Sequence, residues 1–138
     1  MNETVARALV AAVDAEAPRE DRARAAAQVV RDAGNYRWVG IYDVGDEEIA
    51  LIGHSGSTPP ARTRFNITLG LSGAAISTRS TVVSEDRPGS ETSVPILGAE
   101  SGIVIGTLDA QSDRIGAFSA ADVAFLEACA EVLRPLYD

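Results

Sequence analysis

Few residues of this chain could carry out covalent or metal chemistry. It has one His, His54, and one Cys, Cys129, which excludes a multi-cysteine zinc site and an intrachain disulfide. Residues 53–57 (GHSGS) approach the G-x-S-x-G motif of hydrolases, but the fifth position is Ser57 and no strand-turn-helix pattern surrounds it. The sequence therefore predicts no catalytic residue, no metal and no cofactor. His54 is interpreted as a surface loop residue, with haem ligation as the less favoured alternative.

Two aromatic residues and two carboxylates are better candidates for a binding site. Trp38 and Tyr42 are four residues apart in an expected strand, so they point to the same face of a sheet. They line a ligand pocket or form a core pair. Glu91 and Asp109 lie at the ends of apolar segments. They are solvated strand ends, or they share a cavity with a cation, because an unpaired buried charge is costly.

The helices that flank these residues follow from the apolar spacing. Two helices are expected within residues 2–33, with Pro18 in the first turn of the second and Gly34 as its stop. A C-terminal helix is predicted over residues 119–136, opened by a capping-box sequence. Pro135 disfavours a helical residue before it, so this helix is expected to end or kink there.

The sheet that would position the candidates occupies residues 36–111. The expected elements are strands at 36–44 and 48–52, a loop at 53–63, a short strand at 64–68, a short helix at 71–78, and strands at 81–84, 91–97 and 102–109. Helices at both ends and strands between them predict one α+β domain over residues 1–138. Its sheet is antiparallel, with the N- and C-terminal helices packed on one face.

Charge and hydropathy exclude several classes of partner. The net charge is −8 and the 12 basic residues are all Arg with no run among them, so neither nucleic acid nor an anionic membrane is expected as a partner. No segment has the length and apolarity of a membrane span, and the N-terminal residues do not have the pattern of a signal peptide. We therefore expect a cytoplasmic protein.

Five short segments, in order, resemble the free methionine-(R)-sulfoxide reductases, a branch of the GAF domains. The segments are residues 38–42 (WVGIY), 60–64 (PARTR), 70–73 (GLSG), 90–95 (SETSVP) and 105–112 (IGTLDAQS). Each is weak alone, but their shared order spans most of residues 25–135. The resemblance implies a GAF fold, which is related to the PAS fold and is used to sense small molecules.

The resemblance also implies roles for particular residues. Trp38 and Tyr42 would line the ligand site, and Glu91 and Asp109 would contact the ligand's ammonium group. Gln111 stands where the family has a second Asp. That exchange removes a negative charge and adds an amide donor, which would weaken or change the ligand preference.

The thiols of the reductases are missing. Arg62 and Ser72 occupy two of the family's cysteine positions, and the loop that holds the third is shortened to residues 84–90. A serine hydroxyl cannot be oxidised and resolved as a thiol can. Arg62 would pair with a ligand carboxylate or phosphate, or point to solvent. Ser72 would help to bind an anion at the start of its helix, or act as a simple helix cap.

These observations predict a stand-alone GAF domain that binds a small polar, amino-acid-like ligand without redox catalysis. Its signal would pass to a protein partner in trans or through a homodimer formed by the terminal helices. Two alternatives stay open. One is an enzyme with altered sulfoxide reduction that uses Cys129 or an external thiol. The other is a ligand-free interaction or dimerisation module.

Overall fold

A central antiparallel sheet organises the computed structural model, which describes residues 1–56, 60, 63–85 and 89–138. Within these residues six strands are ordered β3-β2-β1-β6-β5-β4, and each neighbouring pair is antiparallel. The strands are β1 (Trp38–Val44), β2 (Glu48–Gly56), β3 (Arg64–Asn66), β4 (Val82–Ser84), β5 (Ser90–Leu97) and β6 (Val104–Ser112). The long strands β1 and β6 lie side by side at the centre.

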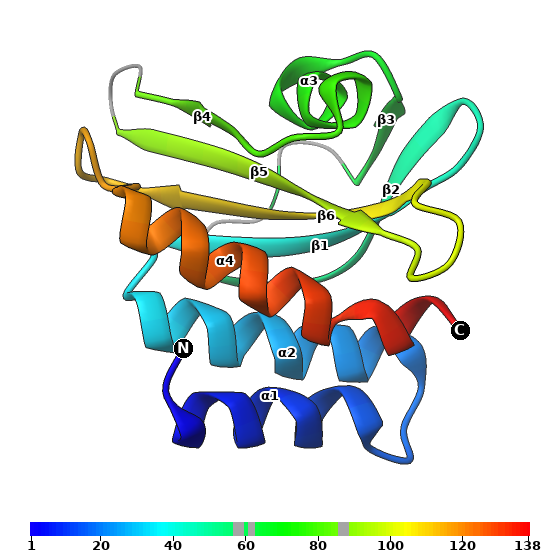
Figure 1. The fold of residues 1–138 in the computed structure, drawn as a ribbon, viewed down its shortest axis with the longest axis vertical. Helices are drawn as coiled ribbons and strands as arrows, with labels where there is room; N and C mark the ends of the chain where they lie inside the picture. The colour runs from blue at the N-terminus through cyan, green and yellow to red at the C-terminus, as the bar shows by residue number, and fades with distance from the viewer. Residues whose placement is uncertain (57–59, 61–62, 86–88) are drawn as a thin grey trace.

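Helices lie on both sides of this sheet (Figure 1). The helices α1 (Glu3–Asp14), α2 (Arg19–Gly34) and α4 (Ala120–Val132) are on one side, and α3 (Gly70–Thr78) is on the other. A 3-10 turn at Arg134–Tyr137 follows α4. The predicted α+β class, with N- and C-terminal helices on one face, is confirmed.

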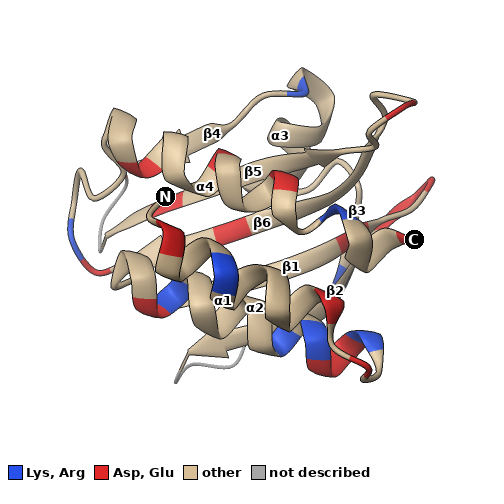
Figure 2. Ribbon diagram, turned by 60° about the horizontal axis from the view of Figure 1, so that its bottom comes forward, with Lys and Arg blue, Asp and Glu red and all other residues tan. Residues whose placement is uncertain are grey.

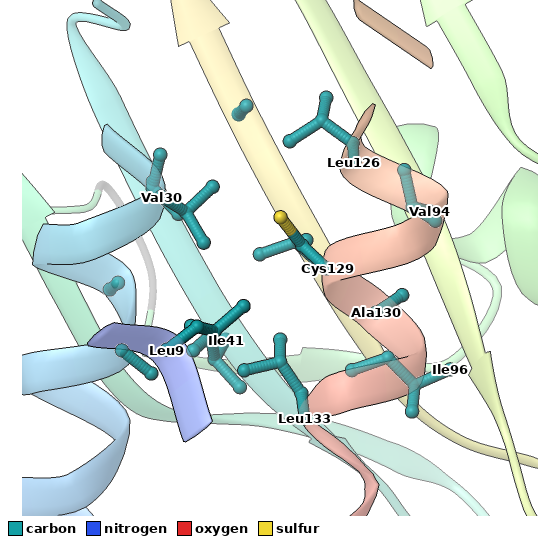
Figure 3. Packing of buried hydrophobic residues seen from close by; sticks show 14 of the residues in the cluster. Leu9, Val30, Ile41, Val94, Ile96, Leu126, Cys129, Ala130 and Leu133 are labelled. Atoms are coloured by element: carbon teal, nitrogen blue, oxygen red, sulfur yellow. The ribbon is translucent and has the colours of Figure 1, made fainter. Parts of the chain in front are cut away.

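The main hydrophobic core fills the space between the sheet and the three helices on that side. Val39, Ile41 and Leu108 enter it from the two central strands, and all three are fully buried. Figure 3 shows the side chains of Cys129, in α4, and of Leu133, directly after that helix, reaching toward the sheet and α2. Burial raises the pKa of the Cys129 thiol to about 12. This cysteine is therefore a protonated packing residue at neutral pH.

Some element boundaries differ from the sequence prediction. β2 continues to Gly56, so His54 lies in a strand and the predicted loop at 53–63 is wrong over its first four residues. Pairing with β1 holds this Gly- and Ser-rich segment extended although its own sequence favours a loop. Gly34 is the last residue of α2, and Asn35, with φ 55°, ends the helix in the left-handed conformation that Asn tolerates.

The ends of α4 match the predicted signals. Ser119 and Asp122 form the capping box, in which each side chain accepts a hydrogen bond from the other residue's backbone. The helix ends at Val132, so Arg134, the residue directly before Pro135, lies outside it. Among the described residues, no helix combines the length and apolarity needed to cross a membrane.

Charged residues on the outer helices are mixed in sign. Figure 2 shows basic and acidic residues interspersed along α1 and α2. Arg7 pairs with Glu3, and Arg24 pairs with Asp21, all largely exposed. Surface pairs of this kind stabilise a fold by less than about 1 kcal/mol each. The apolar core, not these pairs, accounts for the packing of the helices on the sheet.

The core assignment predicts a large effect for Leu108→Ala. Leu108 is fully buried at the centre of the sheet, so the truncation should lower the free energy of unfolding by about 2–5 kcal/mol. Urea denaturation followed by circular dichroism measures this change. Ile103→Ala is the control, because Ile103 is 65% exposed and its truncation should change stability by less than about 0.5 kcal/mol. Equal effects for both variants would contradict the core assignment.

Candidate functional site

The strand register gathers the predicted site residues on the sheet face that carries α3. Three rows of residues cross β1, β6 and β5 on this face. They are Trp38, Gln111 and Glu91; Gly40, Asp109 and Ser93; and Tyr42, Thr107 and Pro95. Because side chains alternate along a strand, the neighbours of these residues in each strand face the helix-side core. The same strands therefore serve the core with one set of positions and the site with the other.

Asp109 is the buried centre of the site. Its two carboxylate oxygens each accept a hydrogen bond of 2.6 Å, one from the Ser72 hydroxyl and one from the Ser93 hydroxyl. Burial raises the pKa of Asp109 to about 6, although the two hydroxyls favour the ionised form, and Glu91 raises it further. The Thr107 hydroxyl also lowers this pKa, yet it makes no hydrogen bond of ordinary geometry among the described residues. Asp109 therefore changes its charge close to neutral pH.

Ser72 comes to Asp109 from above the sheet. It lies in the first turn of α3 and is almost fully buried. The interpretation of Ser72 as a helix cap is wrong, because Leu69 holds that position and the Ser72 hydroxyl donates to Asp109 instead. A Cβ on the next residue, Gly73, would lie 2.7 Å from the Thr68 carbonyl oxygen. The glycine allows α3 to pack closely against the segment before it.

Aromatic rings form a wall beside the carboxylate. The ring centroids of Trp38 and Tyr42 are 6.4 Å apart, and Tyr42 meets Phe65 of β3 edge-on at 5.7 Å. The indole of Trp38 lies over Gly40, where any Cβ would be 2.2 Å from the ring, and stacks on His54 at 6.0 Å. Both predicted aromatic residues are at most 5% exposed. The pair is therefore both buried and adjacent to the site.

Three buried polar atoms on this face have no hydrogen-bond partner among the described residues. They are Trp38 Nε1, His54 Nδ1 and Thr107 Oγ1. Most buried polar groups in proteins are hydrogen-bonded, so a cluster of unpaired ones indicates a place for a polar ligand or for water. The sequence gives no indication of these unpaired atoms, and it predicted His54 to be a surface loop residue.

The end of the site near the start of β1 is charged and more open. Glu91 is exposed, whereas Gln111 is partly buried. Arg37 donates to Gln111 Oε1 at 2.8 Å and to Asp113 Oδ1 at 2.8 Å. Partial desolvation raises the pKa of Glu91, and the Arg37 guanidinium opposes that shift. The carboxylate of Glu91 and the guanidinium of Arg37 are therefore close enough to interact.

The structure brings together most of the predicted site residues. Trp38, Tyr42, Ser72 and Asp109 are buried on one face, and Glu91 and Gln111 lie at its edge. Arg62 lies outside the described residues. Sequence reasoning missed three contributors, which are Ser93, Thr107 and Arg37. Alternation from Glu91 and from Asp109 could have indicated the first two, since each lies two residues away along the same strand.

The described residues of the candidate site include no cysteine and no metal-binding group. The described residues contain no group of His, Cys, Asp and Glu side chains arranged to hold a metal ion. Cys129 lies in the helix-side core, across the sheet from Asp109. A buried carboxylate, unpaired donors and an aromatic wall suit a compact ligand that carries a cation.

Comparison with known proteins gives structural matches. No protein-family model and no curated protein matches the chain. A free methionine-(R)-sulfoxide reductase from Neisseria meningitidis, in complex with its substrate, matches with a TM-score of 0.83 at 28% identity, over 96% of this chain and 86% of that one. A putative GAF sensor protein from Burkholderia vietnamiensis matches with a TM-score of 0.81 at 27% identity, over 94% and 83% of the two chains.

A third match supports the fold alone. The GAF domain of an Acinetobacter phosphoenolpyruvate-protein phosphotransferase has a TM-score of 0.82 at 19% identity, over 99% of this chain and 94% of that one. The chain folds as a GAF domain. The chain is similar in structure both to GAF domains, one of them from a putative sensor protein, and to free methionine-(R)-sulfoxide reductases, as the sequence resemblance implied. The resemblance implies that the reductases use several cysteines, whereas this chain has one.

The raised pKa of Asp109 predicts a pH-dependent effect of Asp109→Asn on the GAF domain. Well below pH 4 the carboxyl is protonated in both the folded and the unfolded chain, so it carries no penalty. As the pH rises from about 4 to about 6, the unfolded chain ionises this carboxyl while the folded state keeps it protonated, so stability is lost until the folded state ionises as well. Relative to the Asn variant, the free energy of unfolding of the wild-type protein should fall by on the order of 2 kcal/mol between pH 4 and 7.

Urea denaturation at several pH values measures this difference. Asp46→Asn is the matched control, because Asp46 is exposed in the β1-β2 turn. Its pH profile should follow that of the wild-type protein. An Asp109→Asn profile that also runs parallel to the wild type would contradict a raised Asp109 pKa.

Proposed function

We propose that this GAF domain binds a free amino acid between the sheet and α3 and acts as a sensor, without redox catalysis. The observation that carries the proposal is the buried Asp109 carboxylate, held by Ser72 and Ser93 beside the Trp38 and Tyr42 rings. Among the described residues, the side-chain hydrogen bonds to this buried anion come from hydroxyl groups, which supply no counter-charge. A ligand ammonium group would supply that charge.

The two carboxylates favour a cation between them. Glu91 raises the pKa of Asp109, so the two groups repel each other when both are ionised. An ammonium group placed between them would remove this repulsion and stabilise both charges. The Trp38, Tyr42 and Phe65 rings would then pack against the ligand's side chain. Together these features suit an α-amino acid better than a sugar or a nucleotide.

The proposed absence of redox catalysis is supported by the residues of this site. The Ser72 hydroxyl occupies the place beside Asp109 where the resembled reductases have a thiol, and it cannot pass through the oxidation states of sulfur. Cys129 is protonated and buried across the sheet. Binding would therefore be the functional event, and a protein partner or a second copy of the chain would transmit it.

The proposal predicts amino-acid binding that depends on both carboxylates. Isothermal titration with the standard amino acids and methionine-(R)-sulfoxide identifies the ligand, and emission from Trp38, the only tryptophan, gives a second readout. Asp109→Asn and Glu91→Gln should each weaken binding by about 10–100-fold, since hydrogen bonds to charged groups contribute about 1.5–3 kcal/mol. Glu47→Gln is the control, because Glu47 is exposed in the β1-β2 turn.

Failure of the wild-type protein to bind any of these compounds would overturn the proposed function. Conversion of methionine-(R)-sulfoxide to methionine in the presence of dithiothreitol would overturn the absence of redox catalysis. Binding that is equally strong in Asp109→Asn would remove the carboxylate from the recognition mechanism.

Affinity should also depend on pH. The ligand ammonium pairs with the ionised form of Asp109, whose pKa is about 6. Between pH 7 and pH 5 the ionised fraction falls about tenfold, so the apparent Kd should rise by about the same factor. Titrations at the two pH values measure this change. A Kd that does not change with pH would contradict an ionised Asp109 as the partner of the ammonium.

A further inference from the structure

Arg37 places a cation near the Glu91 carboxylate at the edge of the site. It directly precedes Trp38, and its main-chain N–H donates to the Gln111 carbonyl at 2.8 Å, which fixes the start of β1 against β6. Its side chain reaches the site face, since Nη2 donates to the Gln111 side chain, the cross-strand neighbour of Trp38. The charge of Arg37 also acts on Glu91. One edge of the site thus holds a guanidinium and a carboxylate together.

The guanidinium has spare hydrogen-bonding capacity. Arg has five N–H donors, and the described residues engage two of them, through Gln111 Oε1 and Asp113 Oδ1. The Arg37 side chain is 35% exposed, so part of the guanidinium is accessible to solvent. Asp113 is 76% exposed, and an ion pair with so exposed a carboxylate is weak and easily exchanged. A second carboxylate could therefore take its place at little cost.

We propose that Arg37 binds the carboxylate of the amino acid whose ammonium group pairs with Asp109 and Glu91. This inference rests on the proposed function and narrows the ligand to a zwitterion with a free α-carboxylate. An α-amino acid carries its two charged groups on one carbon. The site offers Glu91 and Asp109 on adjacent rows of one sheet face, with the Arg37 guanidinium bonded to Gln111 at the end of the Glu91 row. A fork-shaped guanidinium matches the two oxygens of a carboxylate. Amines and amino-acid amides would lack this contact.

Binding of methionine-(R)-sulfoxide and of its carboxamide tests the inference. The two probes share the ammonium group and the side chain, and the amide replaces one charged carboxylate oxygen by an uncharged NH2 group. The wild-type protein should bind the free acid at least tenfold more tightly. Arg37→Met should weaken binding of the acid at least tenfold and of the amide less than twofold, as measured by titration calorimetry.

Two further variants separate ligand contact from structure. Arg7→Met removes an exposed charge of α1 and should change neither affinity. Asp113→Asn frees Arg37 from its competing carboxylate and should tighten binding of the acid about two- to fivefold without affecting the amide. Equal losses for both probes in Arg37→Met, or no preference of the wild-type protein for the acid, would overturn the inference.

The outcomes distinguish this inference from the function on which it rests. If the wild-type protein binds the acid, Asp109→Asn does not, and Arg37→Met binds normally, the role of Arg37 is wrong and the proposed function stands. If the wild-type protein binds neither probe nor any other amino acid, the proposed function fails and the role of Arg37 fails with it.

Discussion

The hydrogen-bonded burial of one carboxylate is the constraint on which the site depends. Asp109 is enclosed by protein, so each of its oxygens needs a donor held in place by a separate element. Ser93 supplies one from the neighbouring strand, and Ser72 supplies the other from α3. The bond from Ser72 also links α3 to the sheet. The position of this short helix and the charge state of the carboxylate are therefore coupled.

The rest of the molecule stabilises this arrangement around Asp109. An apolar core on the far side of the sheet is built from three helices and the inward residues of the central strands. Close packing there holds β1 and β6 in register, and the register sets the rows in which the site residues stand. Tyr137, just after α4, donates a hydrogen bond to the Tyr42 carbonyl at 2.6 Å. The two sides of the sheet are joined through the backbone of β1.

The sequence predicts the fold class and most elements because their signals are local. Apolar spacing marks the helices, and the Ser119–Asp122 capping box and Pro135 mark the limits of α4. The end of β2 was predicted too early, because residues 53–56 are extended only through pairing with β1. Local composition cannot reveal a strand that depends on its partner.

The candidate site was predictable where its signals are local and not where they depend on contacts across the sheet. Motif order pointed to Trp38 and Asp109, and alternation places each on the face under α3. Arg37 carries no signal of its own, since one arginine among 12 gains meaning only from its contact with Gln111 across the sheet. The unpaired His54 nitrogen likewise depends on tertiary packing. Long-range contacts of this kind are set by the register and not by neighbouring residues.

The alternation of β6 has a further consequence for how this chain can change. Leu108, Asp109 and Ala110 point in turn to the core, the site and the core. Positions of the hydrophobic core and of the candidate site thus alternate along one strand. A one-residue insertion or deletion here would exchange the two sets, placing the Asp109 carboxylate in the hydrophobic core and a leucine on the face of the candidate site. The number of residues in β6 is therefore more tightly constrained than their identity.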